Sequence, residues 1–290
     1  MSKKLICFDW ALQRLLRNKA NFGVLEGFLS ELLFETITIE QIIESEGNQE
    51  TYEDKFNRVD ILTINSKGEL VIIEIQNTYE IDYFHRMAYG ASKVLAEHLK
   101  LGQSYTEIKK VISINVVYFD LGQGKDYIYK GRTNFTGLHE KDTLQLSLQQ
   151  KQTFTKKEVA DIFPEYYIIK VNQFDDIAKD TLDEWVYFLK NSEVKDEFKA
   201  KGLAEAKEVL DIMRLNKEQH YGYNRYLDYL HLKASEAFTL RVMAEEKVRT
   251  DERIKFAKSL FNTNMSNDEI AVHTGLEVAQ IAQLRKEPKE

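Results

Sequence analysis

Two adjoining hydrophobic runs, residues 59–64 and 70–76, have the composition of β-strands because Val, Ile and Leu dominate both of them. The stretch Asn65-Ser66-Lys67-Gly68 between them predicts a tight hairpin turn. Apolar residues occupy odd and even positions alike, so neither face of the hairpin is left for water. Strands of this kind lie in the middle of a sheet that is covered on both faces.

Three polar side chains interrupt this apolar pattern: Asp60, Glu74 and Gln76. Glu74 and Gln76 are two positions apart, so they share one face of their strand. If the loop spans Asn65 to Glu69, Asp60 lies opposite Glu74 in the antiparallel pair and joins that face. A slip of one residue would turn Asp60 to the other face, which makes the register a sharp test of this grouping.

A buried carboxylate costs about 3–5 kcal/mol when its partner is missing. A hard divalent cation is a natural partner for two carboxylates and an amide oxygen. The position of the three residues inside buried strands therefore favours a metal site. Two structural interpretations stay open beside it: Asp60 can cap a strand end, and Glu74 can pair with a Lys or Arg of a neighbouring helix.

The chain up to about residue 174 alternates between helical and strand-like patterns, which predicts an α/β domain with a mixed central sheet. Helical spacing predicts helices at residues 9–17, 21–34 and 79–101, with Asn18 or Asn21 as caps. β-Branched runs predict further strands at residues 37–44, 110–118, 144–148 and 166–171. Residues 45–57 are expected to form a polar connection. A hairpin is expected where Tyr127–Tyr129 and Asn134–Gly137 flank the basic turn Lys130-Gly131-Arg132.

Beyond about residue 174 the pattern is helical, beginning with Asp183–Lys190. In the last stretch, Ser266 and Glu269 have the spacing of a capping box, and Gly275 has the position of a helix C-cap. A helix, a Gly-containing turn and a helix form a helix-turn-helix, and a three-helix oligomerisation element fits the same pattern. We predict one domain at residues 1–190 and a helical region at 191–290, with the helix-turn-helix candidate at 253–286.

Composition narrows the class of protein. The 290 residues are 43% hydrophobic and 30% charged, as in soluble globular proteins. No apolar run approaches the ~18 residues that cross a bilayer, and no signal peptide precedes the first helix, so we expect a cytoplasmic protein without a membrane partner. Cys7 is the single cysteine, which excludes an internal disulfide and a cysteine-based metal site. The net charge of −7 argues against a generally basic coat for nucleic acid and is compatible with a local basic groove.

The candidate site residues also belong to a wider set of motifs. Over roughly residues 5–190, the chain resembles the PD-(D/E)xK nuclease family transposases, bacterial proteins also described as recombination-promoting nucleases. The matching stretches are Phe8-Asp9-Trp10-Ala11, Arg14-Leu15-Leu16, Glu26-Gly27-Phe28-Leu29, Asn57-Arg58-Val59-Asp60-Ile61, Glu74-Ile75-Gln76, Tyr83-Phe84-His85-Arg86 with Tyr89, Val111–Phe119 and Asp161-Ile162-Phe163-Pro164.

This resemblance implies a restriction-endonuclease-like core in which Asp60 and Glu74 bind Mg²⁺, with Mn²⁺ as a substitute. The third position of the family signature is usually Lys, and here it is Gln76, which removes a cation that would stabilise negative charge. An acidic residue of an early helix often completes the metal shell. Glu26 and Asp9 are the candidates, and Glu26 is preferred because it lies within an apolar helix face; an ordinary exposed Glu is the alternative.

Arg86 and His85, one helix later, are candidates for contacts with phosphate. The alternatives are that Arg86 pairs with a structural carboxylate such as Glu80 or Asp82, and that His85 is packed or solvated.

Two functions from different classes follow. The first is a Mg²⁺-dependent DNA endonuclease that hydrolyses phosphodiester bonds in mobile-element or recombination biology, acting as a homodimer if it cuts both strands. The second is a catalytically weak or inactive member of the same fold that binds DNA or a protein, and Gln76 keeps this alternative open. A third interpretation is a structural ion-pair network in which Lys55, Arg58 or Arg86 saturates both carboxylates.

Overall fold

A computed structural model describes residues 5–43, 60–99 and 102–286. The chain divides into two compact units, Met1–Tyr223 and Asn224–Glu290. The division lies beyond the boundary expected at residue 190, because α6 (Leu203–Val209) packs against α2 (Phe22–Leu33) of the first unit. The polar connection expected at residues 45–57 and the first residue of the predicted 59–64 strand lie outside the described residues.

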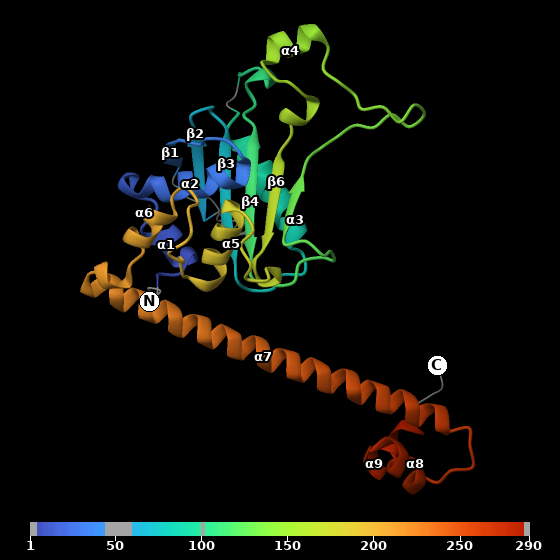
Figure 1. Ribbon diagram of the computed structural model, residues 1–290. Helices are drawn as coiled ribbons and strands as arrows, with labels where there is room; N and C mark the ends of the chain where they lie inside the picture. The colour runs from blue at the N-terminus through green and yellow to red at the C-terminus, as the bar shows by residue number, and fades with distance from the viewer. Residues whose placement is uncertain (1–4, 44–59, 100–101, 287–290) are drawn as a thin grey trace. The chain divides into compact units, whose positions relative to one another are not determined.

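The first unit is built on a six-stranded mixed sheet with strand order β1-β2-β3-β4-β6-β5 (Figure 1). The strands are β1 (Ile39–Ile43), β2 (Ile61–Asn65), β3 (Leu70–Gln76), β4 (Val111–Val117), β5 (Ile128–Gly131) and β6 (Glu165–Lys170). The pairs β3–β4 and β4–β6 are parallel, whereas β1–β2, β2–β3 and β5–β6 are antiparallel. The predicted α/β domain with a mixed central sheet is therefore confirmed.

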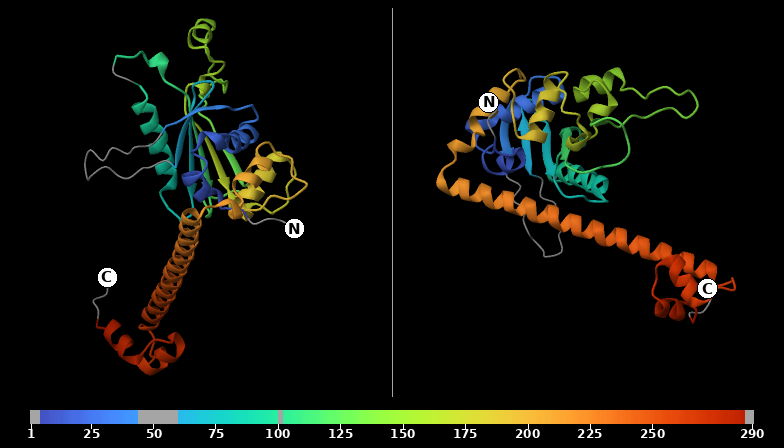
Figure 2. Two further views of the ribbon diagram at one scale, coloured as in Figure 1. Left: turned by 90° about the vertical axis from the view of Figure 1, so that its left-hand side faces the viewer. Right: turned by 60° about the horizontal axis from the view of Figure 1, so that its bottom comes forward.

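Helices cover both faces of this sheet. Helix α3 (Tyr83–Glu97) lies on one face, and α1 (Phe8–Arg14), α2, α5 (Thr181–Asn191) and α6 lie on the other (Figures 1 and 2). Below α3 the core contains Leu62, Leu70, Ile72, Ala91, Val94 and Val111. On the other face it contains the aromatic group Phe8, Phe28, Trp185 and Phe188. Because both faces of the sheet are buried, the central strands have apolar residues at odd and at even positions.

The β2–β3 hairpin has the register that the sequence predicts. Ile61 pairs with Ile73 and Ile64 pairs with Leu70, and the chain turns through residues 66–69 with Gly68 at φ 73°. This left-handed backbone conformation is one that glycine adopts readily. Continuing the pairing by one residue places Asp60 opposite Glu74, so the two carboxylates share the end of the hairpin.

Two expected elements near the sheet edge are wrong. β5 pairs with β6, so Lys130 and Gly131 lie inside a strand and do not form a hairpin turn. The run at residues 144–148 is not a strand, because the Ser147 side chain accepts from the Gln150 main chain in a capping box and starts α4 (Leu148–Phe154). A capping box is a local signal that outweighed a short apolar run.

The N-terminal helices agree in position with the prediction and differ in length. The helix expected at residues 9–17 ends at Arg14, and a 3₁₀ turn follows at Lys19–Asn21, where the Asn18 side chain accepts from Ala20. α2 lies close at Gly27 to the residues immediately before α6, because a Cβ atom there would be 2.4 Å from the Lys201 carbonyl oxygen. The Glu26-Gly27 motif therefore serves helix packing at this point.

The second unit contains most of α7 (Lys217–Leu260), α8 (Asn267–Thr274) and α9 (Val278–Leu284). Its core consists of Ala257, Ile270, Leu276 and Ile281. The predicted capping box of Ser266 and Glu269 is present, and Gly275 ends α8 at φ 67°. The helix–turn–helix arrangement is therefore present, while DNA binding by it stays a prediction. Among the described residues, no helix is long and apolar enough to cross a membrane.

Candidate active site

Carboxylates gather where β2 begins and β3 ends. Glu74 is only 5% exposed, although it lies near the end of its strand on the face that α3 covers. Asp60, immediately before β2, accepts a hydrogen bond from the Ile75 main-chain N–H through Oδ2 at 2.7 Å. Arg17 donates to the main-chain carbonyl of Asp60 at 2.7 Å. The position of Asp60 is thus held from β3 and from the segment after α1.

Helix α3 carries the arginine, Arg86, that pairs with Glu74. Arg86 lies in the first turn of α3, one turn after the buried Tyr83, so its side chain follows Tyr83 toward the sheet. One terminal nitrogen of Arg86 forms an ion pair with Glu74, and the other pairs with Glu80 Oε1 at 2.8 Å. The predicted alternative that Arg86 pairs with Glu80 is correct. The same side chain also reaches Glu74, so the structure brings Arg86 to the candidate site.

Burial dominates the electrostatics of Glu74. The pKa of Glu74 is raised from an ordinary value of 4.5 to about 7: burial raises it most, Arg86 lowers it, and the neighbouring Asp60 and Glu80 raise it. Arg86 forms ion pairs with both Glu74 and Glu80. Glu74 is therefore a buried carboxyl group that lies close to two other carboxylates and to one guanidinium.

Gln76 joins the group through its amide nitrogen. Nε2 donates to Glu80 Oε1 at 2.7 Å and to the Thr78 carbonyl at 3.1 Å. Gln76 is half-buried at the end of β3, on the same face as Glu74. The structure thus brings together Asp60, Glu74, Gln76 and Arg86 from the predicted set and adds Glu80.

A buried polar layer lies next to Glu74 in the sheet. Asn115 of β4 is the register partner of Glu74, and its Oδ1 accepts from the Tyr83 hydroxyl at 3.3 Å. Its Nδ2 donates to Ser113 Oγ at 3.0 Å. Sequence reasoning missed these residues, although the signal was present: Ser113 and Asn115 are polar positions within an otherwise apolar strand. Glu80 was expected only as a structural partner of Arg86, because it lies in the connection between β3 and α3 and interrupts no apolar strand.

The structure does not bring Glu26 to the other carboxylates. Glu26 accepts from the Ile39 main-chain N–H at 2.8 Å, and Ile39 pairs with Asn65 at the far end of β2 from Asp60. The separation along the strand is roughly 16 Å. The less favoured candidate, Asp9, is buried and accepts a hydrogen bond from Asn77, the residue that follows Gln76.

His85 is exposed on α3 and has no hydrogen bond or ion pair with the carboxylates of the site among the described residues. The structural alternative in which Lys55 or Arg58 saturates Asp60 and Glu74 involves residues outside those described.

The donor set fits a cation that keeps much of its own water. Among residues 5–43, 60–99 and 102–286, no group of three or more His, Cys, Asp or Glu side chains forms a ready-made metal cage. Mg²⁺ is commonly bound through one or two carboxylates and completes its shell with water and substrate phosphate. Asp60 and Glu74 on adjacent strands, with an amide side chain beside them, suit such an open site.

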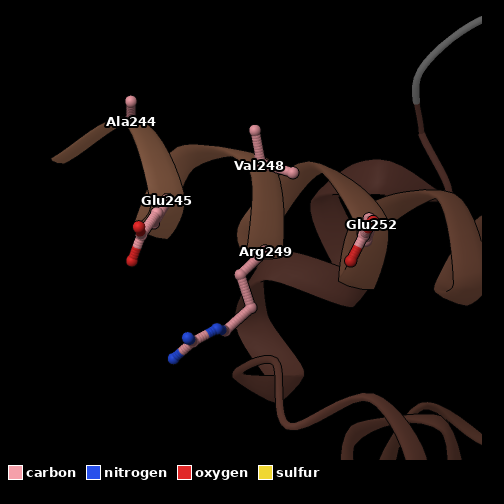
Figure 3. A pocket seen from close by; sticks show the side chains of 5 residues that line it. All are labelled: Ala244, Glu245, Val248, Arg249 and Glu252. Atoms are coloured by element: carbon pink, nitrogen blue, oxygen red, sulfur yellow. The ribbon is translucent and has the colours of Figure 1, made fainter. Parts of the chain in front are cut away.

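A hollow lies elsewhere, on α7, where Ala244, Glu245, Val248, Arg249 and Glu252 line it (Figure 3). All five residues belong to consecutive turns of one helix, and Glu245 pairs with Arg241 of the same helix at 2.9 Å. A hollow formed by a single helix has no opposing wall to hold a ligand. We therefore assign no site to it.

Comparison with known proteins adds the family. A family model described as PD-(D/E)XK nuclease family transposase matches residues 6–237. No curated protein and no solved structure matches the chain. The family match agrees with the predicted restriction-endonuclease-like fold, and the mixed sheet with its flanking helices is consistent with that fold.

Proposed function

The chain belongs to the PD-(D/E)XK nuclease family transposases, and from this membership, which indicates a nuclease-type activity, we propose that the protein is a Mg²⁺-dependent DNA endonuclease. Its substrate is a DNA phosphodiester bond, Mn²⁺ substitutes for Mg²⁺, and its role belongs to mobile-element or recombination biology. Cutting of both strands would require two copies acting together, as a homodimer. The site we propose consists of Asp60, Glu74, Gln76 and Arg86.

The observation that carries the proposal is the closeness of Asp60 to Glu74: Asp60 accepts the main-chain N–H of Ile75 and contributes to the raised pKa of Glu74. Two carboxylates that lie opposite each other at a strand end, one of them 5% exposed, repel each other and raise the free energy of the folded protein. Such an arrangement is costly for a structural ion pair and useful for binding a cation. Perturbed carboxylates of this kind are typical of functional sites.

Each residue then has a role in hydrolysis. Asp60 and Glu74 would hold the cation, which would supply a water of lowered pKa and a charge that polarises the phosphate. Gln76 accepts a hydrogen bond from the attacking water through its carbonyl oxygen and orients it for in-line attack. Arg86 contributes positive charge beside Glu74, where negative charge develops on the phosphate oxygens.

The alternative function is a catalytically weak or inactive member that binds DNA or a protein. The specific observation that favours it is Gln76, since an amide carries no charge at the position where the family usually has Lys. The helix–turn–helix arrangement of α8 and α9 offers such a protein a second contact with DNA.

Plasmid nicking tests the proposal. Full-length wild type, Asp60→Asn and Glu74→Gln are compared in Mg²⁺, in Mn²⁺ and in EDTA, with Glu140→Gln as a control at an exposed carboxylate. We expect metal-dependent cleavage by wild type and the control, and a loss of about a thousandfold or more in both site variants. A folded wild type that never cleaves would favour the binding function, and cleavage retained in both variants would place the site elsewhere.

A further inference from the structure

Glu80 contacts two polar side chains of the candidate site, Gln76 and Arg86, neither of which is a proposed metal ligand. Its Oε1 accepts from Gln76 Nε2 at 2.7 Å and from an Arg86 terminal nitrogen at 2.8 Å. The Glu80 side chain is 31% exposed, so these contacts form at the edge of the buried region. Neither the family signature nor the spacing of the strands points to this residue.

The contacts of Gln76 determine which way its amide faces. Nε2 has two hydrogens, and both have acceptors, Glu80 Oε1 and the Thr78 carbonyl. In the flipped orientation, Oε1 would face a carboxylate and a carbonyl, and three acceptors would repel one another. Oε1 therefore lies on the side of the amide away from Glu80, where it can accept a hydrogen bond from water or bind a cation.

The contacts of Arg86 determine where its charge sits. Its two terminal nitrogens bind different carboxylates, Glu74 and Glu80, as a planar guanidinium fork allows. Nε is buried and has no hydrogen-bond partner among the described residues, so the group is held by the two ion pairs and by its position over the Tyr83 ring, 5.9 Å from the ring centroid. Without Glu80, one end of this fork would be released.

We propose that Glu80 is a positioning residue that divides the role of the missing lysine between two side chains. It turns the carbonyl oxygen of Gln76 toward the cation and its water, and it holds the charge of Arg86 beside Glu74. The proposal rests on the proposed function, because it assigns Glu80 a task at the same site. It explains how a site with Gln76 can keep both an oriented water and a nearby positive charge.

Glu80→Gln and Glu80→Ala separate positioning from charge. Both variants remove the same negative charge, but Gln retains an oxygen that can accept from Gln76 and Arg86, whereas Ala retains none. Glu97→Ala is the matched control, since Glu97 is another carboxylate of the α3 region that pairs with a cation, Lys93, at 3.8 Å. Thermal melting of each full-length variant verifies that it is folded.

The first measurement is the affinity for Mn²⁺ alone, by calorimetry without DNA. We expect Glu80→Ala to bind Mn²⁺ about tenfold more weakly than Glu80→Gln, and Glu97→Ala to match wild type, because residues that orient a ligand typically contribute this much. In the Gln76→Ala background, Glu80→Ala and Glu80→Gln should bind Mn²⁺ with nearly equal affinity, because the amide that Glu80 orients is then absent and both variants lose the same charge. Equal affinities of the two Glu80 variants when Gln76 is present, or a tenfold difference that persists without Gln76, overturn the proposal.

Single-turnover cleavage under saturating Mn²⁺ is the second measurement. Glu80→Ala should cleave more slowly than Glu80→Gln, again by about tenfold, with the effect on the rate constant at saturating protein and not on the protein concentration that gives half of that rate. If wild type binds no Mn²⁺, or if Asp60→Asn binds Mn²⁺ as well as wild type does, the proposed site is rejected and this inference with it. If wild type binds Mn²⁺ and cleaves DNA, but both Glu80 variants behave like Glu97→Ala, only the positioning role is rejected.

Discussion

The Asp60 carboxylate accepts the main-chain N–H of Ile75 at 2.7 Å, and the pairing of Ile61 with Ile73, continued by one residue, places Asp60 opposite Glu74. The hydrogen bond fixes one carboxyl oxygen of Asp60 against β3, directly beside the strand position of Glu74. The two acidic groups are therefore held together by the backbone and not by an attraction between their side chains. Folding brings two like charges together here, and their repulsion lowers the stability of the folded protein by an amount that can be measured.

The substitution Glu74→Gln should stabilise the metal-free protein at alkaline pH. The pKa of Glu74 is raised from 4.5 to about 7, mainly by burial, so between these values the folded protein retains a proton that the unfolded chain has released. Stability linked to Glu74 is therefore lost as the pH rises through this window. Removing the titrating group should raise the free energy of unfolding by up to about 3 kcal/mol near pH 8 and have little effect near pH 4.

Urea unfolding in EDTA across this pH range checks the prediction, with Glu140→Gln as the exposed control. If the difference between Glu74→Gln and wild type were independent of pH, the raised pKa of Glu74 would be wrong.

Metal affinity should increase as the pH rises, whereas the stability linked to Glu74 decreases. A proton and a cation compete for the Glu74 carboxylate, whose pKa is about 7 without metal. Below this value, Mn²⁺ affinity should rise by about tenfold per pH unit, and above it the affinity should level off. Calorimetry in two buffers of different ionisation enthalpy should also detect about one proton released per metal bound near pH 6. A flat affinity profile between pH 5 and pH 8 would show that Glu74 is not a ligand.

Arg86→Lys should impair cleavage almost as strongly as Arg86→Ala. A Lys ammonium keeps the charge but lacks the planar fork that contacts Glu74 and Glu80 together. We expect kcat to fall by about tenfold or more in both variants. Lys93→Ala, which removes a cation from the same helix, should behave like wild type. Activity of Arg86→Lys close to wild type would mean that charge alone is needed.

Glu165, at the start of β6, provides a test of stability at a distance from the site. Burial by itself would raise its pKa, but hydrogen bonds from Lys130, Tyr167 and Lys110 outweigh burial and lower the pKa to about 2. The stabilisation is present above the ordinary value of 4.5 and is lost as the pH falls through about 2.

Glu165→Gln should therefore cost about 3 kcal/mol at neutral pH, with the difference shrinking below pH 4. Metal affinity should not change, because Glu165 begins β6 whereas Glu74 lies near the end of β3, a strand that runs parallel to the same β4. Unfolding curves at neutral and acid pH measure the first effect, and calorimetry with Mn²⁺ measures the second. Equal stability of the two proteins at neutral pH would contradict the assignment of the ion pairs.

The sequence by itself determined the hairpin and the position of its acidic residues. Apolar residues occupy both faces of the two strands, so their burial does not choose the register; the short loop between Asn65 and Leu70, with Gly68 in its turn, does. Asp60 then had to fall opposite Glu74. The same local logic applies to Ser266 and Glu269, whose capping box depends on neighbours within one turn.

Tertiary structure alone decided which helix residues meet these carboxylates. Arg86 and Glu80 reach Glu74 and Gln76 only because α3 packs on the even-numbered face of β3, and no spacing along the chain specifies that packing. Glu26 accepts a hydrogen bond from Ile39 and lies away from the candidate site for the same reason, since α2 packs at Gly27 against Lys201 and Gly202, immediately before α6. The pairing of β5 with β6 likewise joins segments far apart in sequence. Contacts of this kind are selected by the burial of whole faces, which a local pattern does not encode.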